Sequence, residues 1–443
     1  MTPKNPSQLT TILENLNVNN LAIETGFALR QARKISATSL VSGFFQMMIC
    51  GKFSLRLWAT NLSHLTGSCI SFQAIAKKLD YRQESFFHAL FQKALLTKMQ
   101  DSLNFKVNDM LRSFRRVILE DSTCFKLPKG LFEFFPGPRL PHGRMAGARL
   151  QLRIDLVRHN YESISIQNYC QNDASFAEDI LSSLHPDDLV IRDLGYWSLP
   201  VFKKIIQLKA FFLSRLKLNV TVICPLTLDR IDLVSFLRKK ERLGIHQVDM
   251  PILLGDKHQI PVRLVAIKLN DEQTAKRRRM AKNQRHKNIP ITPKNHYLLS
   301  WNLFVTNVEC NVWDVQSVSN VYNLRWHIEM IFKCWKSNFN FTTFFKHCYG
   351  RNPVKPEIIL LLILTWFVLI YIPRFNSCAK AIWRKYGKML SPFRFADFIS
   401  TQLHLLMPLD TPKAYAQIAY HCCYDKRKDR LNHFEKTYMN FLS

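Results

Sequence analysis

The first 110 residues of the chain carry a helical pattern of hydrophobic positions. Leu, Ile and Phe recur there every three or four residues, strand-like alternation is rare, and Gly and Pro are scarce. The pattern predicts a helical N-terminal region over residues 1–110. Within it, SFQAIAKKLDYRQESFFHAL at 71–90 is compatible with two short helices and a turn near Asp80. An ordinary helical bundle explains the same residues.

Alternation of hydrophobic and polar positions begins at Arg115. RRVILEDSTCFKLP reads as an apolar strand that runs into a polar turn, and ARLQLRIDLV and ESISIQNY have the pattern of a hairpin. Strand-like runs follow in DLVIRDLGYW and AFFLSRLK, with helical segments near residues 175–184 and 199–208. This part of the chain therefore predicts a mixed α/β layer that starts with three antiparallel strands.

The rest of the chain changes texture once more. Residues 218–320 contain further strand-like runs and a basic segment at 276–287, which is either a phosphate contact or a solvated helix face. After Val321 the pattern is helical. The longest apolar run, residues 358–372, is followed by Pro373 and falls short of the ~20 residues that cross a bilayer. It therefore predicts a buried helix and no membrane span.

Charge changes this picture by indicating a partner. The chain has 62 Lys and Arg against 33 Asp and Glu, a formal net charge of +29. Such an excess on an aromatic-rich, folded chain favours nucleic acid, with an anionic membrane surface as the competing interpretation. Residues 26–78 contain seven Lys and Arg and no acid, so they are a plausible DNA-binding face, and the segment around Asp80 fits a helix-turn-helix weakly.

Cysteine usage points to a reducing compartment. The eleven cysteines are scattered, with no CxxC pair and no regular framework. A disulfide scaffold and a zinc ribbon are therefore both unlikely to explain them. Because the N-terminus also lacks an apolar signal region, we expect a cytoplasmic protein.

The segment with the clearest chemical content is YNLRWHIEMIFKCWKSNF at 322–339. Read as a helix at 100° per residue, one face of about 80° gathers five functional side chains. They are Tyr322, Arg325, Glu329, Lys333 and Lys336. An apolar stripe adjoins this face. Ordinary i,i+4 ion pairs on a solvated face are the bland alternative. A carboxylate ringed by cations instead indicates a metal ligand with phosphate-binding groups beside it.

One carboxylate rarely makes a metal site, so we looked for partners at strand ends. Asp121 ends the strand-like RRVILED and Asp193 ends LVIRD, and a rigid sheet edge can hold such ligands accurately. Each is also explained as a turn-starting or capping Asp. Glu120 would face the other side of its strand. Asp155 and Asp188 are weaker options, because neither ends an apolar strand at a turn.

These patterns together resemble the DDE transposases of the insertion sequence 4 family. The resemblance rests on strand-Asp-Ser-Thr at Asp121, strand-Asp-Leu-Gly-Tyr at Asp193, and Tyr-x2-Arg-x3-Glu-x6-Lys from Tyr322 to Lys336. It covers about residues 115–346. It implies an α/β fold: a ribonuclease H-like catalytic core with an inserted mainly-β domain and helical N- and C-terminal regions. Asp121 would lie on the first strand, Asp193 on the fourth, and Glu329 on the helix after the insertion.

The domain organisation follows from combining this resemblance with the patterns. The predicted parts are a helical DNA-binding region at 1–110, the first part of the core at 111–217, the mainly-β insertion at 218–320, the last core helices at 321–375, and a helical C-terminal region at 376–443.

The resemblance also implies a chemistry. Asp121, Asp193 and Glu329 would hold two Mg²⁺ or Mn²⁺ ions for DNA strand cleavage and transfer. Arg325, Lys333 and Lys336 would contact phosphates, Tyr322 would hydrogen-bond one, and Trp326 would stack on an unpaired base. Trp301 and Trp313 are weaker stacking candidates. The partners would be terminal inverted repeats and target DNA, bound by a homodimer.

Two other functions remain open at this point. One is a transposase-derived DNA-binding protein without catalysis, which the retention of all three acids argues against. The other is a ribonuclease H-like nuclease or recombinase that acts without a transposon. Such an enzyme would not need the Tyr-Arg-Glu-Lys pattern of residues 322–336 or the large insertion.

Overall fold

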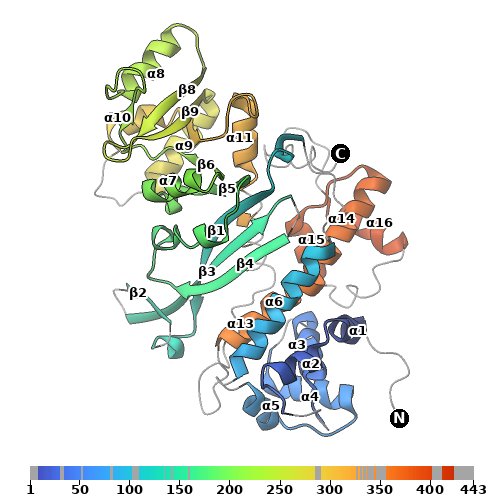
Figure 1. Ribbon diagram of the computed structural model, residues 1–443. Coiled ribbons are helices and arrows are strands. Elements are labelled where there is room, and N and C mark those ends of the chain that lie inside the picture. The colour runs from blue at the N-terminus through green and yellow to red at the C-terminus, as the bar shows by residue number, and fades with distance from the viewer. Residues whose placement is uncertain are drawn as a thin grey trace.

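A ten-stranded mixed sheet forms the centre of the protein (Figure 1). The computed structural model describes residues 8–29, 34–50, 53–79, 83–101, 109–133, 135–140, 143–157, 160–284, 291–325, 328–329, 332, 336, 344–345, 356–401 and 412–423. The strands are β1 (Arg116–Leu127), β2 (Pro136–Leu140), β3 (Gly143–Asp155), β4 (Asn160–Asn168), β5 (Asp188–Arg192), β6 (Phe211–Arg215), β7 (Val222–Ile223), β8 (Gln247–Leu254), β9 (Ile260–Lys268) and β10 (Trp301–Thr306). They follow the order β2-β3-β1-β5-β6-β10-β9-β8-β7, and β4 pairs with β3.

Five of these strands form the ribonuclease H-like core. β4, β3 and β1 are antiparallel neighbours, and β5 and β6 continue the sheet parallel to β1. The parallel connections need crossovers, which the short helical turns after β4 and helix α7 (Leu199–Gln207) supply. The predicted hairpin, the three antiparallel strands and the two strands after them are therefore confirmed.

Strand β1 is longer than the sequence pattern predicted. The polar turn expected after Asp121 is absent, and β1 pairs with β3 as far as Leu127. Thr123, Phe125 and Leu127 are buried while the residues between them are more exposed, which is the period of a strand with one packed face. Asp121 thus lies in the middle of a strand and not at its end.

The inserted segment does not form a sheet of its own. Its strands β10, β9, β8 and β7 extend the core sheet, beginning with the antiparallel pairing of β10 on β6. Helices α8 (Leu233–Arg242), α9 (Asp271–Gln284) and α10 (Pro293–Leu298) lie between these strands in sequence. The strands predicted for residues 218–320 are present, but the segment is mixed α/β rather than mainly β.

The helices from both ends of the chain pack together on one face of the core strands (Figure 1). The N-terminal helices are α1 (Gln8–Asn15), α2 (Val18–Glu24), α3 (Ala37–Cys50), α4 (Leu55–Thr66), α5 (Phe72–Lys78) and α6 (Glu84–Asp101). The C-terminal helices are α13 (Pro356–Trp366), α14 (Ile372–Tyr386), α15 (Pro392–Thr401) and α16 (Pro412–His421). They share one hydrophobic core, in which α13 contacts α3 and α6.

The apolar run at 358–372 is a core helix, as predicted. A π-helical stretch, Phe367–Tyr371, joins α13 to α14, so residues 356–386 form one helical segment of 31 residues. Its length and composition would suffice to cross a membrane, yet 78% of its most apolar window is buried inside the protein. Packing against the N-terminal helices accounts for its hydrophobic sequence.

Candidate functional site

The pairing of β1 with β5 brings Asp121 and Asp193 together. The parallel register ends with Glu120 opposite Arg192, so the two aspartates are the next residues along their strands. Both have the same strand parity as Leu119 and Ile191, which are buried beneath helix α11 (Val315–Asn323). The two carboxylates therefore lie side by side on the face of the sheet that α11 covers.

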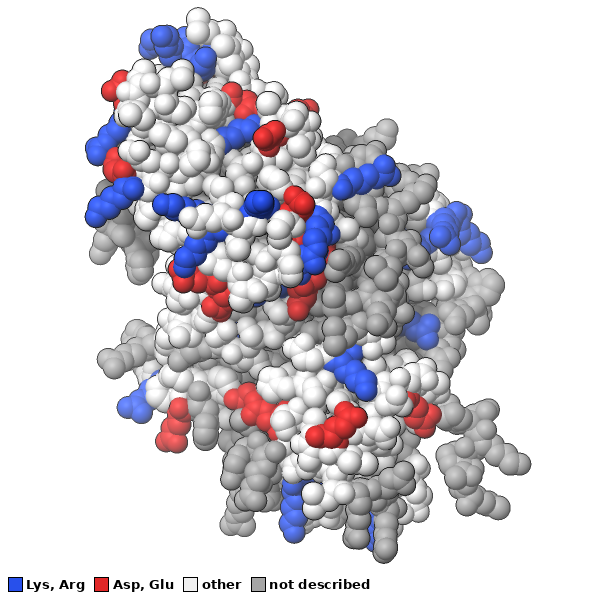
Figure 2. All heavy atoms as spheres, viewed as in Figure 1, with Lys and Arg blue, Asp and Glu red and all other residues white. Residues whose placement is uncertain are grey.

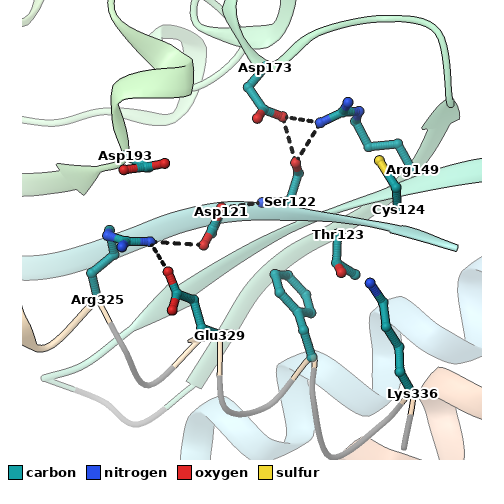
Figure 3. A pocket seen from close by; sticks show the side chains of 11 residues that line it. Asp121, Ser122, Thr123, Cys124, Arg149, Asp173, Asp193, Arg325, Glu329 and Lys336 are labelled. Atoms are coloured by element: carbon teal, nitrogen blue, oxygen red, sulfur yellow. Dashed lines mark hydrogen bonds and ion pairs between the residues drawn. The ribbon is translucent and has the colours of Figure 1, made fainter. Parts of the chain in front are cut away.

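Glu329 reaches the same place from the helical side. Ile328 and Phe332 are buried in the core shared by the terminal helices, which fixes the segment that carries Glu329. Glu329 itself keeps 36% of its side chain exposed. The three acids line one cavity of about 490 Å³ together with Arg325 and Lys336 (Figure 3). The sequence thus identified three carboxylates that the fold brings together.

Arg325 links two of the three acids. Its Nη1 lies 3.2 Å from Asp121 Oδ2 and 2.6 Å from Glu329 Oε1. The sequence predicted Arg325 as a phosphate contact, and these ion pairs add a second role. The pKa of Arg325 is raised, because the nearby Tyr322 and carboxylates outweigh the opposing effect of burial.

The electrostatics of the cavity are dominated by its acids. Burial raises the pKa of Asp121 to about 7, and the charges of Asp193 and Glu329 act in the same direction. Arg325 and the backbone N–H of Ser122, which donates to Oδ1 at 2.8 Å, lower it. A carboxyl group whose pKa lies this close to neutral pH has too little positive charge around it to stabilise its ionised form fully. A bound cation would supply that charge.

Tyr322 does not share one helix with Glu329. Helix α11 ends at Asn323, and Leu324 and Arg325 lie in a turn before the helical residues that follow. Tyr322 is 2% exposed, and the guanidinium groups of Arg325 and Arg215 lie 5.7 and 5.4 Å from its ring centroid. In this position the ring of Tyr322 packs against the guanidinium of Arg325. A phosphate could reach Tyr322 only if the side chains packed around it moved.

Lys336 lies at the other end of the cavity. Its side chain points toward Thr123 of β1 (Figure 3), and burial lowers its pKa, against a smaller opposing effect of Cys124. It is free of any carboxylate ion pair in the described part of the chain. Lys333 and Trp326 lie outside the described residues, so their predicted DNA contacts remain predictions.

The chemistry of the three acids fits a divalent cation. Carboxylate oxygens are the ligands that Mg²⁺ and Mn²⁺ prefer. Arg325 shows that Asp121 and Glu329 can share one positive charge. Among the described residues, however, no group of three acid, His or Cys side chains converges closely enough to hold a metal ion as they stand. Metal binding would therefore require Arg325 and the acids to adjust.

The acids that the sequence ranked lower have structural roles. Glu120 faces away from Asp121, is 1% exposed, and pairs with Arg153 and Arg192 at 2.6 and 2.5 Å. Asp155 accepts the backbone N–H groups of residues 117 and 157. Asp188 is bound by Arg116. None of these three side chains lines the cavity.

The structure adds residues that sequence reasoning missed. Asp173, Arg149 and Ser122 also line the cavity, and they form a hydrogen-bonded group on the opposite side of β1 from Glu329 (Figure 3). Asp173 follows the hairpin in a polar stretch without periodicity, so no pattern singled it out.

The two weaker base-stacking candidates are core residues. Trp301 and Trp313 are 1% and 0% exposed, which leaves no face for base stacking.

The basic segment of the insertion is partly accounted for. Residues 271–284 form α9, where Arg277 donates to Trp301 O and Asn302 Oδ1, and Arg278 donates to His296 O. These two arginines therefore hold α9 to its neighbours. Lys276, Arg279 and Lys282 are exposed. For these three residues both interpretations stay open, a phosphate contact or a solvated helix face.

A ribonuclease H-like sheet with three carboxylates and two cations in one cavity is the arrangement that the resemblance to DDE transposases implied. Residues 112–367 match the family described as Transposase DDE domain, and the chain belongs to this family. The prediction of a DDE-type transposase is thereby confirmed.

Its relatives are transposases of bacterial insertion sequences. The chain is 27% identical over 412 residues to the transposase of IS231F from Bacillus thuringiensis subsp. israelensis, and 29% identical over 415 residues to that of IS231C from B. thuringiensis subsp. berliner. Each match covers 88% of this chain and 83% of the relative. The transposase of IS1151 from Clostridium perfringens is 27% identical over 289 residues, 60% of this chain and 59% of that protein.

Among solved structures, the chain aligns with a piggyBac transposase synaptic complex with hairpin DNA. The TM-score is 0.41 and the identity 10%, over 96% of this chain and 87% of that one.

Proposed function

We propose that this transposase excises and integrates an insertion sequence by cutting DNA strands at the element's ends and joining them to target DNA. The observation that carries the proposal is the cavity in which Asp121, Asp193 and Glu329 meet beside Arg325 and Lys336. In cleavage, a water oxygen would attack phosphorus and the bond to the 3′ oxygen would break, leaving a 3′-hydroxyl. In joining, that 3′ oxygen would attack a phosphorus of the target strand, and the bond from this phosphorus to the target's own 3′ oxygen would break, leaving a 3′-hydroxyl on the target.

Asp121, Asp193 and Glu329 would hold Mg²⁺ or Mn²⁺. Three carboxylates can hold two such ions, and two ions suit this reaction. Such ions activate the attacking oxygen and stabilise the leaving oxygen of an in-line displacement. The residues themselves would orient the ions against the scissile phosphate. Arg325 and Glu329 would separate when the phosphate arrives, because the phosphate offers the guanidinium an anionic partner in place of Glu329.

Lys336 would contact a phosphate beyond the three acids. It follows Glu329 by seven residues, which on a continuous helix would be ~10.5 Å along the axis and too far for a direct pair between them. Its half-buried ammonium points into the cavity, where it offers a charge-assisted hydrogen bond. Lys333 and Trp326 would extend this contact surface.

DNA is the expected partner of the whole molecule. The terminal inverted repeats and the target duplex would both bind, and cutting two ends together implies a homodimer on DNA. The helical region at 1–110, with its acid-free stretch, would bind the ends. We expect the protein to work in the cytoplasm, on the chromosome and its plasmids.

Single alanine variants of Asp121, Asp193 and Glu329 test the proposal. Each should abolish Mg²⁺-dependent cleavage of a duplex carrying the element's end, because the three carboxylates act as one unit, while binding to that duplex stays within a few fold. Glu178→Ala, which changes an exposed acid in the turn after residues 173–176, is the matched control and should cleave normally.

Three results would contradict this proposal. Normal cleavage by any of the three variants would remove that acid from the site. A wild-type protein that binds DNA ends without cutting them in Mg²⁺ or Mn²⁺ would favour a silent DNA-binding protein. Cutting without any joining to target DNA would favour a nuclease.

A further inference from the structure

A fourth carboxylate lines the cavity and has a different kind of environment from the other three. Asp173 begins a short 3₁₀ helix, Asp173–Phe176, which the Asn172 side chain caps by accepting the N–H of Ser175. Asp173 Oδ1 accepts hydrogen bonds from Ser122 Oγ at 2.6 Å and from Arg149 Nη1 at 2.7 Å. Since this oxygen is already saturated by donors, Asp173 is poorly suited to be a metal ligand.

The other oxygen of Asp173 lies against the 3₁₀ turn Leu194–Tyr196, which directly follows Asp193. A Cβ atom added to Gly195 would lie 2.8 Å from Asp173 Oδ2, closer than real contacts allow. A side chain at residue 195 would therefore force Asp173 to move, whereas the φ of Gly195 does not itself require a glycine. Asp173 thus touches the residue after Asp121 on one side and the residue two after Asp193 on the other.

A chain of hydrogen bonds surrounds the contact between Asp173 and Gly195. Gln151 Nε2 donates to Asp173 Oδ1 at 3.4 Å, and Gln151 Oε1 accepts from the buried hydroxyl of Tyr196. Arg149 Nη1 donates to Ser122 Oγ at 2.8 Å as well as to Asp173. The connection runs from Ser122 through Asp173 and Gln151 to Tyr196, that is, from the strand of Asp121 to the turn after Asp193.

This connection lies where the backbone no longer ties the two strands. The last paired residues of β1 and β5 are Glu120 and Arg192, so Asp121 and Asp193 stand beyond the end of the ladder. Their like charges repel each other at close range. Without a tie past the ladder, the end of β5 would be free to move away from β1, which continues past Asp121 paired with β3.

We infer that Asp173 is a positioning residue that sets the spacing of Asp121 and Asp193. The inference rests on the proposed function, because the spacing matters only if both acids hold the same metal ions. Partners that orient metal ligands without touching the metal commonly change metal affinity ten- to hundredfold when removed. Asp173 would act in this way through Ser122 and Gly195.

The test measures Mn²⁺ affinity by titration of the full-length protein, with free Mn²⁺ followed by electron paramagnetic resonance. Asp173→Ala should weaken Mn²⁺ binding about ten- to hundredfold and leave binding to end DNA within about threefold. Asp179→Ala changes an exposed acid six residues on and should alter neither. Cleavage by Asp173→Ala should recover in part at high Mg²⁺, which a residue with a merely structural role would not allow.

Gly195→Ala provides a second and independent variant. Alone it should weaken Mn²⁺ binding, because its methyl group pushes against Asp173. Combined with Asp173→Ala, whose shorter side chain removes the clash, it should cost little more than Asp173→Ala alone. Thermal unfolding should show the same non-additivity, which detects the contact even if a single variant folds poorly.

The outcomes separate this inference from the proposed function. Normal Mn²⁺ affinity in a folded Asp173→Ala variant, with Asp121→Ala defective, would overturn the positioning role alone. Loss of DNA binding at unchanged Mn²⁺ affinity would also overturn it and make Asp173 part of a DNA contact. Mn²⁺ binding that does not depend on Asp121 would overturn the proposed function instead.

Discussion

Asp121 is a carboxylate that the fold keeps largely away from water, with 13% of its side chain exposed. Burial and the neighbouring acids raise its pKa from 3.8 to about 7, and Arg325 offsets only part of this effect. Between about pH 4 and 7 the folded protein therefore holds a proton that the unfolded chain has lost. By linkage, the metal-free protein should lose stability as the pH rises through that window.

Asp121→Asn should remove this loss of stability with rising pH. The amide stays neutral at every pH, so the variant should unfold at a higher temperature than wild type at pH 8 in EDTA, with a smaller difference at pH 5. Three pKa units correspond to at most about 4 kcal/mol. Thermal unfolding at both pH values measures the effect, and Asp179→Asn is the exposed control. A lower Tm for Asp121→Asn at pH 8 would show that ionised Asp121 stabilises the fold.

At the scale of strands, β1 carries its two acids on opposite faces. Asp121 faces the cavity, while Glu120 is buried between Arg153 of β3 and Arg192 of β5. This pair of contacts ties three neighbouring strands directly beneath the site. The acid that looks functional from its place in the sequence, next to Asp121, is therefore a structural one.

Glu120→Ala should destabilise the protein by about 3–5 kcal/mol, because it leaves the guanidinium groups of buried Arg192 and partly buried Arg153 without their carboxylate. Glu120→Gln keeps the size of the side chain and one acceptor, so it should cost less. Urea unfolding followed by circular dichroism measures both. A loss below about 1 kcal/mol for Glu120→Ala would mean that Arg153 and Arg192 reach water or other partners once Glu120 is gone.

Periodicity along the chain predicted most of the core elements, whereas the choice of the three acids that share the cavity also drew on the resemblance to DDE transposases. It failed at Ser122–Thr123, where polar residues resemble a turn although they continue β1. Their partners, such as Gln151 opposite Ser122, come from a strand later in the sequence. Such partners leave no signal in a local pattern.

The same limit of local patterns explains two other differences between what the sequence predicted and what the structure shows. The angles of a helical wheel assume an unbroken helix, so they could not show that α11 ends between Tyr322 and Glu329. Asp173 has neither periodicity nor a strand end beside it. Only the packing of its 3₁₀ helix against Gly195 brings it to the site.

At the scale of the whole molecule, the two ends of the chain depend on each other. Buried residues of α3 and α4, such as Phe44 and Trp58, belong to one core with α13. The predicted region 1–110 therefore cannot be separated from the C-terminal helices without exposing this core. Lys and Arg side chains are spread over the visible surface and do not form a single patch (Figure 2). DNA contacts are better tested in the full-length protein.

Lys77→Glu and Arg56→Glu, two exposed cations of the acid-free stretch, should each weaken binding to end DNA. If each contacts one phosphate, the slope of log K against log salt should fall by about 0.9 per contact. Fluorescence anisotropy at several salt concentrations measures this slope. Lys203→Glu, exposed on α7, is the control. Unchanged slopes for both variants would place end recognition outside the N-terminal helices.

The pair between Arg325 and Asp121 spans 204 residues of sequence. At a ribosomal rate of about 5–20 residues per second, the second half of the cavity is made roughly 10–40 s after the first. The helices that bury α3 and α6 are made later still. A growing chain thus lacks a complete cavity until Glu329 and Lys336 have been made, and a chain terminated before them never acquires one. Synthesis itself therefore delays the assembly of the proposed site.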